Sequence, residues 1–223
     1  MRKQLQRFIL GLLVVALFAA EASAQWNVAR FDEAPNRVYT TVGLDPAFLP
    51  TVGYARVLSV FGHHVQLAGD VGIAIAEFDT RDFRARVQAL TSIVQWRSLY
   101  LTGSTAVIGR GTENSIYRGY NFGVDLTGTL GLYRPRWFVA AEFGLDKAVV
   151  TRVTHSEWYR TYFYADAKDG WYRNTGGTVH YGLTAGLTVG RVELLARYGM
   201  QRTEKLNELT PPMYASIGLG LAF

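Results

Sequence analysis

The sequence lacks cysteine and contains few charged residues. None of its 223 residues is Cys, and 18% are Asp, Glu, Lys or Arg. The absence of Cys excludes disulfide frameworks, thiolate metal sites, cysteine nucleophiles and a lipid anchor on an N-terminal Cys. Beyond residue 24 no apolar run reaches 18 residues, so we expect no membrane-spanning helix there. The sequence has no stripe of Lys and Arg residues of the kind that would indicate a nucleic-acid partner.

The first 24 residues have the three parts of a secretory signal peptide. A basic start is followed by an apolar run over 8–20 and by a small-x-small cleavage site at 22–24. We expect cleavage after Ala24 and a mature chain that begins at Gln25. The formal charge of +5 for the whole chain then falls to about +3.

From residue 37 onward, apolar side chains recur at every second position. In 177–189, for example, one face carries Val179, Tyr181, Leu183, Ala185, Leu187 and Val189. The other face carries Gly, Thr and isolated charges, whereas a soluble sheet would present Lys and Glu to water. This pattern suits a small closed barrel whose apolar side faces lipid, since closure satisfies every backbone hydrogen-bonding group. We predict an all-β fold, a transmembrane antiparallel up-and-down β-barrel.

The alternation predicts ten strands, with eight as the alternative. They are expected at 37–45, 51–61, 64–78, 82–96, 99–109, 117–133, 136–150, 177–189, 192–203 and 212–223. The plan is therefore a signal peptide at 1–24, a periplasmic lead-in at 25–36 and a barrel at 37–223, with an outer hairpin at 151–176. Short periplasmic turns and longer outer loops are typical of such barrels.

Tight turns are expected at 62–63, 97–98, 134–135 and 190–191. Strict pairing across 62–63 would place Arg56 on the lipid face, where an Arg near the midplane costs about 2–4 kcal/mol. We therefore expect a bulge or a three-residue turn there, with Arg56 pointing inward near Asp70.

The last strand has a characteristic pattern. Apolar residues occupy every second position up to the end: Ile217, Leu219, Leu221 and Phe223. This resembles the C-terminal strand signal of bacterial outer-membrane proteins, and the architecture resembles that of small OmpX-, OmpW- and omptin-like barrels. The resemblance implies an outer-membrane location, insertion by the barrel assembly machinery, and contact with outer-membrane lipid and lipopolysaccharide.

Charged residues on the small-residue face predict a cluster inside the barrel. Its expected members are Asp70, Asp125, Glu142, Arg197 and Arg56. Buried charges persist only when paired, so we interpret them as a structural filling of the lumen. The alternative is a narrow channel that favours cations, because inward Gly186, Gly218 and Gly220 leave room for water.

The segment 151–176 is rich in aromatic residues and arginine, the types enriched in binding hot spots. Its candidate binding residues are Trp158, Tyr159, Arg160, Tyr162, Trp171 and Arg173. We expect this hairpin to contact a host, a matrix component or another membrane protein. The rival interpretation is that it rests on lipopolysaccharide and has no other partner.

A catalytic role is the remaining alternative, as a lipid- or peptide-hydrolysing barrel. A deacylase of the PagL type needs His-x-Ser, and the triplet at 180–182 is His-Tyr-Gly. Asp166 and Asp169 flank Lys168, which makes a poor calcium site. We expect no catalytic residues, no metal and no cofactor.

Overall fold

The computed structural model describes residues 26–44, 49–73, 81–203 and 212–223. The expected signal peptide, with its cleavage site after Ala24, lies outside the described residues, as do parts of the strands expected at 37–45 and 64–78. Within the described ranges, no helix combines the length and apolar character needed to cross a membrane.

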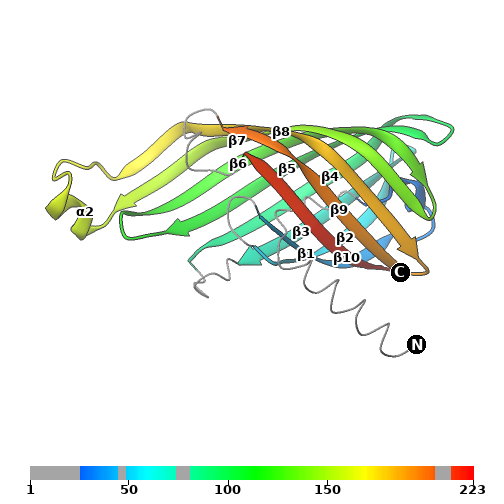
Figure 1. Cartoon of the computed structure of the whole chain (residues 1–223), viewed down its shortest axis with the longest axis horizontal. Helices are drawn as coiled ribbons and strands as arrows, with labels where there is room; N and C mark the ends of the chain where they lie inside the picture. Colours follow the sequence, from blue (N-terminus) through cyan, green and yellow to red (C-terminus); the bar gives the residue numbers. More distant parts are fainter. Residues whose placement is uncertain (1–25, 45–48, 74–80, 204–211) are drawn as a thin grey trace, which may run out of the picture.

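Ten antiparallel strands form a closed barrel in which β1 pairs with β10 (Figure 1). The strands are β1 (Asn36–Leu44), β2 (Thr51–Val60), β3 (His63–Ile73), β4 (Phe83–Trp96), β5 (Leu99–Glu113), β6 (Tyr117–Arg134), β7 (Trp137–His155), β8 (Gly170–Val189), β9 (Val192–Thr203) and β10 (Met213–Ala222). A 3-10 helix, η1 (Val28–Arg30), precedes β1, and α2 (Glu157–Tyr162) lies between β7 and β8. The prediction of an all-β, ten-stranded up-and-down barrel is confirmed, and the alternative of eight strands is wrong.

Side chains alternate between an inner and an outer face of the barrel wall. In β9 the buried residues Glu193, Leu195 and Arg197 alternate with the exposed Val192, Leu194 and Ala196. The outer face of the described strands is largely apolar, and the inner face carries the polar groups. The period-two pattern of the sequence therefore corresponds to the two sides of one closed sheet.

The barrel has two different ends. At the terminal end, β1 begins beside the last residue, and the main chains of Asn36 and Phe223 exchange two hydrogen bonds. Strands near this closure are short, since β1, β2 and β10 have 9, 10 and 10 residues. At the opposite, distal end, β6, β7 and β8 continue to 18, 19 and 20 residues and carry α2 (Figure 1).

Four two-residue turns join the strands at the terminal end. Cross-strand pairs confirm two predicted turns, at 97–98 and 190–191. The other two lie one residue away from the prediction, at 61–62 and 135–136. Phe61 and Gly62 have φ angles of 49° and 80°, the left-handed pair that a tight type I′ hairpin needs. The glycine at the second position makes this turn possible one residue earlier than expected.

The prediction that Arg56 points inward is wrong. β2 and β3 pair without a bulge, and Arg56 lies opposite Leu67 on the outer face, exposed beside Tyr54 and Leu58. The prediction assumed a position near mid-height. Arg56 instead lies level with Asn36, the first residue of β1, so it is close to the terminal end. A long arginine side chain can reach past the apolar belt from there, which removes the expected penalty.

Candidate functional site

Residues that precede β1 fill the terminal end of the barrel. Trp26 and Phe31 are buried, with 1% and 4% of their surface exposed. The Trp26 ring occupies the space where Gly220 of β10 would otherwise carry a Cβ. Asn27 caps η1 and donates a 2.7 Å hydrogen bond to the main-chain oxygen of Arg134 at the end of β6. Part of the expected lead-in at 25–36 thus packs within the barrel; we call residues 26–35 the closing segment.

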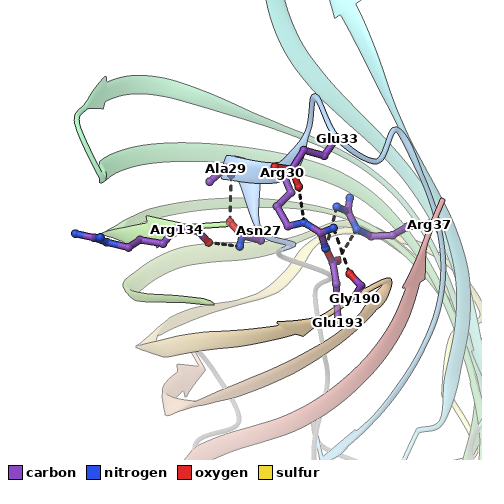
Figure 2. A network of polar contacts seen from close by, with 8 residues as sticks. All are labelled: Asn27, Ala29, Arg30, Glu33, Arg37, Arg134, Gly190 and Glu193. Carbon is purple, nitrogen blue, oxygen red and sulfur yellow. Dashed lines mark hydrogen bonds and ion pairs between the residues drawn. The ribbon is translucent and has the colours of Figure 1, made fainter. Parts of the chain in front are cut away.

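A buried carboxylate on β9 holds the closing segment (Figure 2). Glu193 accepts hydrogen bonds from Arg30 Nη1 at 3.0 Å and from Arg37 Nε at 2.6 Å. Arg30 also pairs with Glu33 at 3.1 Å, inside the segment itself. The side chain of Arg37 is fully buried, so its charge needs this partner. Glu193 therefore links the segment, β1 and β9.

Aromatic rings lie over glycines on the inner face. Tyr39 occupies the space above Gly53, and Phe138 the space above Gly186. A Cβ at either glycine would collide with the ring, so ring and glycine are complementary in shape. The channel alternative relied on room beside Gly186 and Gly220. Phe138 and Trp26 occupy that room.

Asp70, a predicted interior residue, is buried and pairs with the strand beside it. Its Oδ2 accepts from Arg86 Nη2 at 2.7 Å and from the Tyr39 hydroxyl at 2.9 Å. Asp70 and Arg86 are direct cross-strand partners on β3 and β4. Tyr39 occupies an inward-facing position in the alternating pattern of β1, and this signal could have identified it as the third residue of the group formed with Asp70 and Arg86.

Glu142 and Arg197, also predicted, form a buried pair that spans three strands. Arg197 of β9 donates from Nε to Glu142 of β7 at 3.0 Å, and its Nη2 bonds the other carboxylate oxygen. Tyr214 of β10 donates to the same carboxylate at 2.8 Å. Tyr214, Gly199, Gly182 and Glu142 are successive partners in one row across the sheet. Because Gly182 and Gly199 have no side chains, the Tyr214 ring can lie across them toward Glu142.

Asp125 is only half-buried, and it lies toward the distal end. It accepts a 2.9 Å hydrogen bond from Thr127, whose hydroxyl lies 3.1 Å from His180 Nε2. Its cross-strand partner Asp146 pairs with Arg110. Each carboxylate that faces the interior here is thus matched by a donor, as a filled lumen requires.

The predicted outer hairpin has an ordered framework. β7 and β8 pair beyond the barrel up to Val153 and Gly170, with a register shift near Val149. Ser156 caps α2 by accepting from the main-chain nitrogen of Tyr159 at 3.1 Å. Its hydroxyl also donates to the main-chain oxygen of Ser115 at 2.6 Å, which joins the hairpin to the β5–β6 connection.

The structure divides the predicted hairpin residues into a tip and a base. Trp158 and Tyr162 lie on α2 at the tip and are 48% and 72% exposed, whereas Tyr159 is half-buried and stacks on His155. Trp171 and Arg173 lie on β8 at the base. Phe163 and Tyr164, next to α2, are exposed as well, although they were not among the candidates.

Arg160, a predicted binding residue, holds the tip together through an ion pair. Its Nη2 lies 2.5 Å from Asp169 Oδ2. The other Asp169 oxygen accepts from the main-chain nitrogen of His155 at 2.8 Å. The hydrogen bond from Arg160, followed by that from the His155 main chain, holds the pKa of Asp169 well below its usual range. Asp169 therefore clamps α2 to the end of β7.

The predicted assembly residues line the outer face of β10. Leu219, Leu221 and Phe223 are exposed, and Ile217 is half-buried on the same face. They lie beside the seam where β10 meets β1.

Across the described ranges, no group of three or more His, Asp or Glu side chains is arranged to hold a metal ion. Comparison of the sequence with models of protein families and with curated proteins finds no match.

Proposed function

We propose that this protein is a non-enzymatic outer-membrane β-barrel that acts through the tip of its distal hairpin. The observation that carries the proposal is a group of exposed aromatic side chains on a framework held by hydrogen bonds and an ion pair. Trp158, Tyr162, Phe163 and Tyr164 are each about half exposed or more. Rigid, exposed aromatic anchors are the residue types that dominate binding surfaces.

The interior supports this assignment by leaving little for a substrate. Arg197 and Arg86 are paired with Glu142 and Asp70, and the closing segment fills the terminal end. The apolar outer face of the described strands supports the membrane setting, because a soluble protein rarely exposes so large an apolar surface. The outer-membrane location, export and assembly by the barrel machinery are parts of the same proposal.

Fractionation tests the location. We expect the protein in the outer-membrane fraction, with gel mobility that changes on heating, and with poorer assembly when Phe223 is deleted. A periplasmic protein whose mobility is unaffected by heating would refute the proposal.

Binding to immobilised probes tests the role of the tip. We expect cells that display the protein to bind members of an array of matrix proteins and cell-surface glycans, and Trp158→Ser with Tyr162→Ser to remove this binding. The matched control is Phe61→Ser, because Phe61 is 99% exposed at the opposite end of the barrel. All three proteins should fold and show heat-modifiable mobility. Unchanged binding in the folded tip variant would show that the tip is not the functional surface.

A further inference from the structure

Two arginines at the base of the hairpin lie side by side on the outer face. Arg152 of β7 has Tyr120 of β6 and Trp171 of β8 as its cross-strand partners. Arg173 lies two residues after Trp171, so it is the diagonal neighbour of Arg152. Such neighbours have Cα atoms about 7–8 Å apart, close enough for both guanidinium groups to reach one anion.

These two arginines differ from their neighbours in having no carboxylate partner. Arg110, Arg118 and Arg160 pair with Asp146, Glu113 and Asp169. In the described part of the chain neither Arg152 nor Arg173 makes an ion pair, and both are exposed. Two unpaired guanidinium groups at this spacing suit a phosphate, which binds the arginine fork through two oxygens.

The arginines lie at the upper edge of the apolar outer face. Arg173 is level with Val150 and Phe122, which are partners on β7 and β6. Below this row, the outer face of β6 continues through Val124, Leu126 and Leu130. Aromatic residues and arginine directly above an apolar belt are the arrangement expected at lipid headgroups.

An apolar hollow lies farther down the same face. It has a volume of about 640 Å³ and is lined by Leu101, Leu126, Phe143 and Leu145, among others. Gly128 forms part of its floor, where an added Cβ would meet no side chain, and its cross-strand partner Gly103 lies beneath the side chain of Ile93. Leu145 lies roughly 20 Å from Arg152 along a strand tilted by about 40°, which places it about 15 Å deeper, or half of the roughly 30 Å hydrocarbon core.

We propose that Arg152 and Arg173 bind the phosphate of a phosphorylated lipid, and that an acyl chain of the same lipid occupies the hollow at Gly103 and Gly128. Tyr120 and Trp171 flank the phosphate at the headgroup level. This inference rests on the membrane location in the proposed function, but it concerns the base of the hairpin rather than the tip. A lipid held there would orient the hairpin above the membrane.

Binding of lipid A to the purified full-length barrel in detergent tests the inference, with native mass spectrometry as the readout. Lipid A from which the phosphates have been removed is the second probe, and inorganic phosphate is the third. We expect tight binding of lipid A, at least about tenfold weaker binding of the dephosphorylated form, and no competition by an equal concentration of inorganic phosphate. Equal binding of the two lipids, or full competition by inorganic phosphate, would overturn the proposal.

Matched variants locate the site. Arg152→Gln with Arg173→Gln should weaken lipid A binding at least about tenfold and leave the dephosphorylated lipid unaffected. Arg202→Gln is the control, because Arg202 is exposed on the same face but lies opposite Val179. Gly128→Leu fills the hollow and should weaken binding of both lipids. Unchanged binding in either test variant, or an equal loss in the control, would refute the site.

The outcome is separable from that of the proposed function. A barrel that is absent from the outer-membrane fraction would refute the proposed function itself. A barrel that inserts and binds through its tip, but whose affinity for lipid A does not depend on Arg152 and Arg173, would refute this inference alone.

Discussion

Two glutamates in this protein each bridge two arginines, one at each end of the barrel. Glu193 at the terminal end joins Arg30 and Arg37, and all three side chains are almost fully buried. Glu113 at the distal end joins Arg81 and Arg118, whose side chains are 58% and 50% exposed. The same chemical unit therefore lies in two dielectric environments within one sheet.

The difference indicates how the two ends divide their tasks. Around Glu193, ion pairs and rings such as Trp26 keep the charges of Glu193 and Arg37 buried, so this end is built to stay closed. Around Glu113, charges remain hydrated and are screened by salt. Surface pairs of this kind contribute little to stability, and they allow the distal end to vary its contacts.

Substitution of Glu193 and Glu113, one at a time, should give the largest difference in stability between the two ends. Glu193→Leu leaves the fully buried Arg37 without a carboxylate and Arg30 with Glu33 alone, and breaking a buried pair in this way typically costs about 3–5 kcal/mol in the free energy of unfolding. Glu113→Leu should change that free energy little, because its partners are hydrated. Urea unfolding of the barrel in lipid vesicles, followed by tryptophan fluorescence, measures both.

The same pair of variants tests whether the terminal end is the closed one. We expect wild-type protein and Glu113→Leu to conduct ions poorly in planar bilayers, and Glu193→Leu to conduct more, because its closing segment has lost its anchor. Equal losses of stability, or a large conductance in the wild type, would contradict the division between the two ends.

The sequence predicted the wall of the barrel well, for a physical reason. Alternation reports which side of a strand is apolar, and that property is local. It correctly predicted the ten strands, and the turn at 190–191 follows from Val189 and Val192 facing the same way. It misplaced the turn at 61–62 by one residue, which changes the partner of Arg56 but not its face, and the inward prediction failed because strand β2 has no bulge and Arg56 lies near the terminal end.

The contents of the barrel were harder to predict, because they depend on which strands approach each other across the lumen. Asp70 and Glu142 could be identified as inward-facing, but their partners Arg86 and Tyr214 depend on strand register and tilt. The closing segment has no periodicity to detect. Its signal was a buried type of residue, Trp26, placed just before the first strand.

Tyrosine hydroxyls provide a second, smaller comparison of the two regions. Tyr214→Phe removes one donor from the buried carboxylate of Glu142 and should cost about 2 kcal/mol, because a charged acceptor is left short of a hydrogen bond. Tyr172→Phe removes a bond to the main-chain oxygen of Lys168 in the exposed hairpin and should cost under about 1 kcal/mol. Both variants keep their rings. Equal effects in urea unfolding would show that burial does not distinguish the two sites.

The smallest expected effect is the response of the hairpin tip to acid. Arg160 lowers the pKa of Asp169 in the folded tip relative to the unfolded chain. Its contribution is therefore complete above the unfolded value, near pH 4, and is lost as the pH falls through the lower folded value. Protease cleavage at the tip, measured from pH 7 to pH 2 with an acid-tolerant protease, should increase only below about pH 4, while the buried Glu193 end stays uncut. Asp169→Asn should be cut readily at every pH, since the asparagine side chain, like a protonated Asp169, has no charge to pair with Arg160. A transition centred above pH 5, or a pH dependence that survives in Asp169→Asn, would show that another group holds the tip.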